Sequence, residues 1–196
     1  MKDEDASIDS GSVGDPTRFR TLAELERGLE ALGRARAERG RVVRVVRRGE
    51  AGRRESLERA RLSPEAGVEG DASGRRASPS AEMQVAVMEA AVAELIANGQ
   101  PLPLFGDNLF LDLDLSESNL SAGSRVRAGG ALLEVTPMPH NGCRKFQARF
   151  GPDALRFVAS KALRQRRLRG LYLRVVTAGE LGPGDPVEVV ERATPA

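Results

Sequence analysis

Residues 121–146, with the sequence SAGSRVRAGGALLEVTPMPHNGCRKF, give the strongest indication of the fold. Residues 125–127 and 131–136 are rich in β-branched and aliphatic side chains, which favour strands. The Gly-Gly pair at 129–130 suits a tight turn between them. The stretch therefore predicts a β-hairpin.

The segment after the hairpin is predicted to be a loop, HNGCRKF (140–146), with Pro137 and Pro139 stiffening its entry. It holds the only cysteine of the chain, Cys143, and the only histidine, His140. A single residue of each type excludes a disulfide scaffold, a zinc finger and any metal site built from several cysteines or histidines.

Elsewhere in the chain, further strands are predicted at 41–49, 171–179 and 187–190. The first of these is basic and β-branched, so we expect it near a sheet edge. In 109–115 every second residue is leucine, the pattern of a half-buried extended segment. Residues 50–80 mix Gly, Pro, Ser and charge, and predict loops and short strands.

An N-terminal amphipathic helix is predicted over 18–40. Thr21 and Glu24 have the spacing of a capping box, which satisfies two free amides at a helix start. One apolar stripe follows at helical spacing, and it consists of Leu22, Leu25, Leu29 and Leu32.

Two more helices are predicted, one with Met88 to Ile96 on its apolar face and one from Asp153 to about Leu168. Residues 1–17 are expected to form a flexible acidic tail, and 41–192 a single domain. The expected fold class is β-rich, mainly β with a few helices, in the form of a barrel-like sheet with helical decoration.

Positive charge is concentrated in one part of the chain. The whole sequence has 30 basic and 28 acidic residues, a formal net charge of +2. Residues 141–174 contain ten basic side chains and one acidic, a local net charge of +9 that leaves −7 for the rest. Such a concentration predicts an anionic ligand. Aromatic residues make up only 4% of the chain, which argues against a nucleic-acid platform based on stacking.

Cys143 lies inside this basic segment, beside Arg144 and Lys145. Neighbouring cations favour a thiolate, and a soft thiolate suits a soft metal whose other ligands come from an anionic cofactor. An inert buried cysteine is the alternative. His140 is a candidate base for the thiol, although no third residue of a hydrolase triad is evident.

Several segments in this order resemble the MOSC domain, named after the C-terminal part of molybdenum cofactor sulfurases. The resemblance covers about residues 40–191 and is to a stand-alone, bacterial-type member. The matching segments are GVEGD (67–71), QVAVM (84–88), LFGDNL (104–109), the 121–146 stretch, LRGLYLRVV (168–176) and GPGDPVEVV (182–190).

The resemblance implies a MOSC-type β-barrel-like fold that binds molybdenum cofactor, a pterin dithiolene with a phosphate. By position, Cys143 would be the catalytic residue and the thiolate ligand of molybdenum. Pyridoxal phosphate belongs to another domain of the fused sulfurases, for which 196 residues leave no room. The residues expected to contact the cofactor are Arg169, Arg167, Lys145, Arg144, Asn108, Asp107 and His140.

The function implied is an oxidoreductase that reduces small N-oxygenated compounds with electrons from a donor protein in trans. One alternative is a sulfur-transfer module, in which a Cys143 persulfide is loaded by a sulfur donor in trans. The other is a non-enzymatic basic domain for anions or nucleic acid. The acidic N-terminus and the short apolar runs predict a cytoplasmic protein without a membrane partner. We also expect Arg169→Ala to weaken cofactor retention and leave the fold intact.

Overall fold

Seven strands form a closed barrel in the computed structural model, which describes residues 11–33, 35–74 and 80–194. The strands follow the order β11-β7-β8-β9-β5-β6-β1, and β1 pairs back onto β11. The barrel is predominantly antiparallel, and β5 and β6 are its parallel pair. Its members are β1 (Arg39–Arg48), β5 (Val85–Glu89), β6 (Leu109–Leu111), β7 (Arg125–Ala128), β8 (Ala131–Val135), β9 (Leu171–Thr177) and β11 (Pro186–Glu191).

The short strands predicted for residues 50–80 are confirmed, except that 75–79 lie outside the described residues. β2 (Arg54–Ser56) extends the sheet beside β1. β3 (Ala60–Ser63) and β4 (Gly67–Val68) form a small sheet with β10 (Gly179–Leu181), a strand that the sequence did not indicate.

The predicted hairpin is confirmed in β7 and β8, which pair from Arg125 opposite Glu134 to Ala128 opposite Ala131. Gly129 turns the chain with a φ of +53°, a left-handed conformation that glycine adopts without strain.

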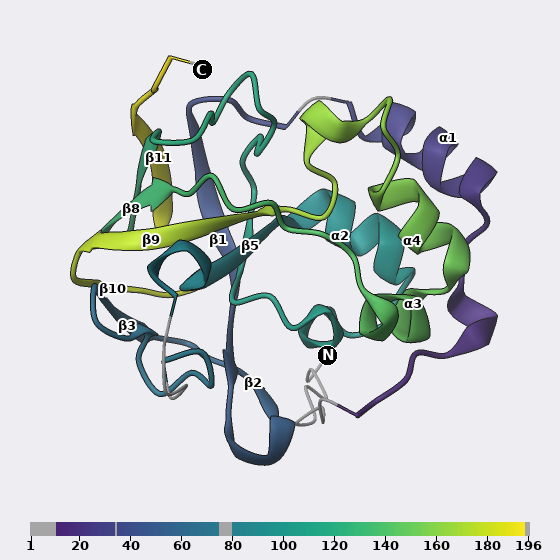
Figure 1. The fold of residues 1–196 in the computed structure, drawn as a ribbon, viewed down its shortest axis with the longest axis horizontal. Helices are drawn as coiled ribbons and strands as arrows, with labels where there is room; N and C mark the ends of the chain where they lie inside the picture. Colours follow the sequence, from purple (N-terminus) through teal and green to yellow (C-terminus); the bar gives the residue numbers. More distant parts are fainter. Residues whose placement is uncertain (1–10, 34, 75–79, 195–196) are drawn as a thin grey trace.

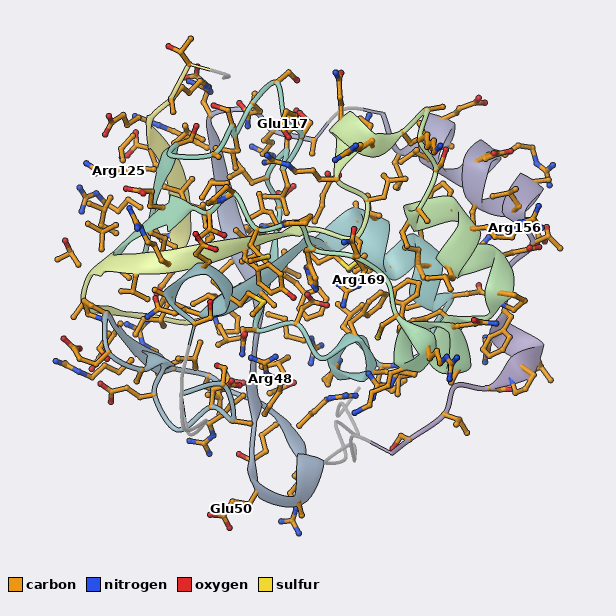
Figure 2. All side chains as sticks on the ribbon, in the orientation of Figure 1. Arg48, Glu50, Glu117, Arg125, Arg156 and Arg169 are labelled. Carbon is orange, nitrogen blue, oxygen red and sulfur yellow. The ribbon has the colours of Figure 1, made fainter. Side chains whose placement is uncertain are left out.

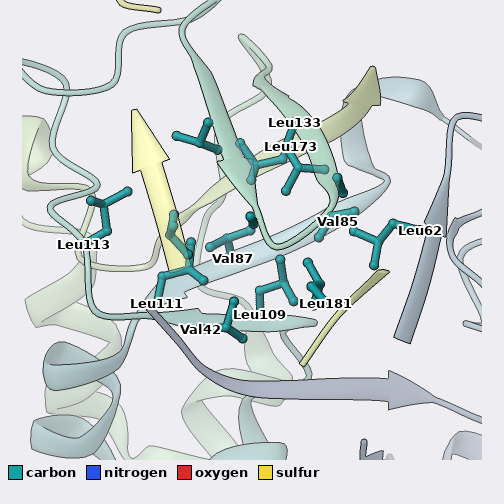
Figure 3. Packing of buried hydrophobic residues seen from close by; sticks show 14 of the residues in the cluster. Val42, Leu62, Val85, Val87, Leu109, Leu111, Leu113, Leu133, Leu173 and Leu181 are labelled. Atoms are coloured by element: carbon teal, nitrogen blue, oxygen red, sulfur yellow. The ribbon is translucent and has the colours of Figure 1, made fainter. Parts of the chain in front are cut away.

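Strands β5 and β6, which face the helices, are buried on both sides. Leu109 and Leu111 point into the barrel, where an apolar cluster fills the interior (Figure 3). Phe110 points the other way, into a second cluster under the helices, and is fully buried. The alternation expected at 109–115 is confirmed in its leucines, which are all buried, and in Asp112 and Asp114, which are partly exposed. Phe110 departs from it, because alternation at this position separates two cores rather than a core from water.

Four helices lie together on one side of the barrel (Figure 1). Their shared core includes a group of phenylalanines, of which Phe105 and Phe150 stack with ring centroids 4.0 Å apart. The helices are α1 (Leu22–Leu32), α2 (Ala90–Ala97), α3 (Arg144–Phe150) and α4 (Pro152–Val158).

The N-terminal helix is shorter than predicted. Its capping box is confirmed, and Leu25 and Leu29 are buried. The helix ends at Leu32 because Gly33 adopts a φ of +69°, and β1 already begins at Arg39, so the predicted extension to residue 40 is wrong.

Three other predicted boundaries are wrong because tertiary contacts override local patterns. Met88 belongs to β5, and α2 starts only at Ala90. Residues 144–146 of the expected loop form the first turn of α3. The last helix, α4, ends at Val158 rather than near Leu168.

β1 is not an edge strand, since it lies between β6 and β11 and closes the barrel. The flexible tail predicted for 1–17 falls partly on residues 1–10, which lie outside the described residues. The remainder docks on α3, where the Gly14 amide donates to the Ala148 carbonyl at 3.1 Å.

Replacement of Thr21 by alanine is expected to lower the Tm by about 2–4 °C, because the helix start loses its cap. Thr21 Oγ1 accepts from the Glu24 amide, and the Glu24 carboxylate accepts from the Thr21 amide at 2.8 Å. Thermal unfolding followed by circular dichroism measures the shift. Thr21→Ser keeps the hydroxyl and should restore the Tm; equal losses in both variants would contradict a capping role.

Candidate functional site

A cleft of about 500 Å³ opens between two segments that leave the barrel. One is the loop that follows β8, from Thr136 to Asn141, and the other connects α4 to β9, from Val158 to Leu171. Ala122 and Glu117 complete the lining. A cavity of this size accommodates a small-molecule ligand.

The wall of the cleft is positively charged. Lys161, Arg164, Arg167 and Arg169 all line it. Arg167 is held in place by Glu117 at 2.6 Å and by the Leu120 carbonyl. Lys161 and Arg164 are exposed and form no ion pair with any residue that the structure describes, so their charge is available to an anion.

Asp107 lies beneath the cleft, behind Arg169 and His140, which line it. Its carboxylate is completely buried. Arg169 Nη1 donates to Asp107 Oδ2 at 2.7 Å, and His140 Nδ1 lies 3.5 Å from Asp107 Oδ1. Three residues that the sequence proposed as cofactor contacts are therefore brought together, although they are distant in the chain.

Arg169 reaches this position from the segment before β9 and lies near the centre of the molecule (Figure 2). Its guanidinium carbon is 5.2 Å from the centre of the Phe146 ring, and its Nε atom is buried without a hydrogen-bond partner. Gly170 fixes the backbone there, because its φ is +91° and a Cβ would lie 1.9 Å from the Val87 carbonyl oxygen.

His140 is a neutral imidazole at physiological pH. Its side chain is 6% exposed, and its ring centroid is 4.3 Å from that of Tyr172. Burial lowers the pKa of His140 to about 3; Arg169 and Arg48 lower it further, while Asp107 opposes them.

Asn108 is buried next to Asp107 but contributes to a different network. Its amide nitrogen donates to Asp71 Oδ2 at 2.9 Å, and its oxygen accepts from the Ala86 amide and from Arg48. Burial raises the pKa of Asp71, but hydrogen bonds from Arg48 and Ser73 outweigh it and lower the pKa to about 2. Asn108 thus ties β1 to β5 and does not line the cleft.

Cys143 is exposed and lies just outside the cleft, two residues beyond Asn141, which lines it. The residue occupies the N-cap position of α3, and its carbonyl accepts from the Gln147 amide. The alternative of an inert buried cysteine is wrong. Arg144 and Lys145, the neighbours expected to contact the cofactor, are also exposed and do not line the cleft.

A buried cation lies near the thiol. Arg149 is 4% exposed, and its Nε atom donates to the Ser12 carbonyl. Burial lowers the pKa of Arg149, and the Cys143 thiolate opposes that shift. Arg149 is thus a further cation near Cys143, beside the flanking Arg144 and Lys145, whose side chains face solvent.

The sequence placed the positive charge within residues 141–174, but it did not show how these side chains are arranged in space. Lys161 and Arg164 belong to the basic segment 141–174 but were not assigned to the site. The high density of basic residues in that segment was the only signal that could have identified them. Other cations of that segment are neutralised elsewhere: Arg156 pairs with Asp153 and Arg174 with Glu134. Figure 2 shows Arg156 at the helical edge of the molecule, far from Arg169.

Among the described residues, no three His, Cys, Asp or Glu side chains gather in a way that would hold a metal ion. Over the same residues, no helix has the length and apolar character needed to cross a membrane.

Comparison with solved structures supports the fold. YiiM from Escherichia coli is 23% identical, with 79% of this chain and 71% of that chain covered at a TM-score of 0.52. The YUAD protein from Bacillus subtilis is 18% identical, with coverages of 79% and 97% and a TM-score of 0.58. YiiM from Geobacillus stearothermophilus is 20% identical, with coverages of 81% and 76% and a TM-score of 0.51. No curated protein matches the chain.

The match to a family model covers all or part of every barrel strand except β1. The model of the MOSC domain matches residues 80–188, more than half of the chain. That range contains β5 to β10, part of β11, and the lining of the cleft. Together with the barrel, this match shows that the chain belongs to the MOSC domain family.

Proposed function

We propose that this protein binds molybdenum cofactor at the cleft and reduces small N-oxygenated compounds, with Cys143 as the thiolate ligand of the metal. The observation that carries the proposal is the placement of an exposed thiol two residues beyond a cleft walled by four cations. An anionic cofactor with a soft metal requires this combination of groups.

The residues fit such a cofactor in three respects. The cleft has the volume of a small-molecule site. Lys161 and Arg164 offer charge that no described residue neutralises, which suits a phosphate. Cys143 is accessible, and the buried guanidinium of Arg149 lies near it.

Each group of this chain has a defined task in the proposal. Lys161 and Arg164 bind the phosphate, and Arg169 orients it from the floor of the cleft. Cys143 holds the metal from the rim. When bound, the molybdenum centre supplies the two-electron chemistry, and a donor protein in trans supplies the electrons. A cytoplasmic location, where the cofactor is made, is part of the same proposal.

The test is the metal and pterin content of the full chain purified from a host that makes the cofactor. We expect about one molybdenum per chain in the wild type and its loss in Cys143→Ser. Arg144→Gln, next in the chain but outside the cleft, is the matched control and should retain the metal. Absence of molybdenum and pterin from the wild type would contradict the proposal.

A second candidate function is sulfur transfer through a Cys143 persulfide. It is favoured by the position of the thiol, which lies on the surface rather than within the cleft and can be reached by a donor protein. Cyanide-labile sulfur on the wild type, absent in Cys143→Ser and unaccompanied by molybdenum, would support this candidate over the first.

Of the three candidate functions, nucleic-acid binding by a basic domain has the least support. Much of the positive charge near the cleft is already paired within the chain, as in Arg167 with Glu117 and Arg169 with Asp107. Nucleic-acid affinity that falls steeply with salt, in protein without metal or labile sulfur, would favour it.

A further inference from the structure

Asp107 holds two side chains that together present a donor and an acceptor to the cleft. One carboxylate oxygen accepts from Arg169, and the other faces His140 Nδ1 at 3.5 Å. All three side chains are at least nine-tenths buried, with exposed fractions of 0% for Asp107, 6% for His140 and 10% for Arg169.

The carboxylate determines which nitrogen of His140 carries the proton. A proton on Nδ1 points at Asp107 Oδ1, whereas the other tautomer would place a lone pair against a carboxylate oxygen. Both atoms are buried without another hydrogen-bond partner, so a small movement of the ring completes this bond when a ligand binds. Nε2 is then left as an acceptor.

The acceptor faces the ligand space. His140 lines the cleft, and of its two nitrogens only Nδ1 is fully buried without a partner. Nε2 is therefore the nitrogen that a ligand can reach. The low pKa of His140, about 3, keeps this nitrogen unprotonated at neutral pH. Lys161, Arg164 and Arg169 line the same cleft and offer only hydrogen-bond donors.

We propose that the cleft selects an oxyanion that keeps a proton at neutral pH, with hydrogen phosphate as the simplest example, and that His140 Nε2 accepts that proton. Asp107 is the positioning residue that fixes the tautomer, and His140 is the specificity determinant. The inference uses the cleft of the proposed function but requires neither molybdenum nor Cys143.

The physical basis of the selection is the acceptor at His140 Nε2. A protonated oxygen donates to Nε2, whereas an oxygen of sulfate would bring a lone pair against the lone pair of the nitrogen. The cations attract both anions alike and do not discriminate between them. Discrimination therefore depends on His140, and overall affinity depends on the cations.

The test measures binding of inorganic phosphate and of sulfate to the full chain by calorimetry, near neutral pH and at constant ionic strength. Phosphate should bind the wild type about tenfold or more tightly than sulfate, because one hydrogen bond involving a charged ligand separates them. In His140→Phe the two affinities should agree within about twofold, through loss of phosphate affinity alone. Lys161→Gln, the matched control, should weaken both anions by the same factor.

Asp107→Asn tests the tautomer. The amide group of asparagine can donate to Nδ1, which moves the histidine proton to Nε2 and turns the acceptor into a donor. The preference should then reverse in favour of sulfate. Near-UV circular dichroism reports whether this variant folds, and if it does not, His140→Phe decides the question alone.

Equal affinities of the wild type for the two anions, binding of neither, or a preference that survives in His140→Phe would each overturn the inference. The molybdenum measurement is independent. Molybdenum in the wild type without a phosphate preference would remove this inference alone, and a phosphate preference without molybdenum would remove the cofactor assignment alone.

Discussion

Replacement of Arg169 by alanine is expected to lower the free energy of unfolding by about 3–5 kcal/mol, because it leaves a buried carboxylate without its partner. Asp107 is completely buried, and Arg169 Nη1 is 2.7 Å from its oxygen. The contact of the guanidinium with the Phe146 ring is lost as well. The sequence-based expectation of an intact fold in this variant is therefore replaced by a large destabilisation.

Urea unfolding of the two proteins measures this difference. Arg164→Ala is the matched control, since Arg164 lines the same cleft but is exposed, and its effect should stay within about 0.5 kcal/mol. Removal of both charges in Asp107→Asn with Arg169→Met should recover much of the loss, because no uncompensated charge remains. A loss below about 1 kcal/mol in Arg169→Ala would show that water solvates Asp107.

Local chemistry made the hairpin predictable. The turn at Gly129 needs a left-handed conformation, and the sequence supplies two glycines there. The helix start at Thr21 was also predictable, because Thr21 and its capping partner Glu24 are only three residues apart. Helix α2 stops at Asn98, which adopts the left-handed conformation that commonly ends a helix.

The features that the sequence did not predict depend on partners distant in the chain. Met88 has helical spacing with its neighbours, yet it lies in β5 because that strand pairs with β6 and β9. Phe110 is buried only because helices cover the outer face of its strand. Within the site, the resemblance to the MOSC domain implied Arg169, Asp107 and His140 as candidates. Their contacts appear only once the barrel brings residues 107, 140 and 169 together.

Glu89, at the end of β5, is a buried carboxyl group that no sequence pattern singled out. It is 6% exposed and accepts no hydrogen bond from any described residue. Burial raises the pKa of Glu89 from 4.5 to about 7; Arg166 opposes this shift, and Asp114 and Asp112 add to it. Near neutral pH the folded protein therefore holds a proton on Glu89 that the unfolded chain has already released.

This proton makes stability fall as the pH rises. Between pH 4.5 and about 7 the folded state binds more protons at Glu89 than the unfolded state, so unfolding becomes easier with each added pH unit. The total effect is up to about 3 kcal/mol and is complete above the folded-state pKa. Glu89→Gln cannot ionise, so above neutral pH it should be more stable than the wild type by up to this amount, and below pH 4.5 the two should agree.

Urea midpoints measured from pH 4 to pH 8.5 on both proteins test this result. Glu94→Gln, an exposed position on α2, is the matched control and should keep the wild-type slope. The predicted effect is a change in the slope of unfolding free energy against pH, and it is confined to the range from pH 4.5 to about 7. A general stabilisation from removing a negative charge would not produce a change confined to this range. Parallel curves for Glu89→Gln and the wild type would mean that the Glu89 carboxylate is already solvated or paired in the folded state.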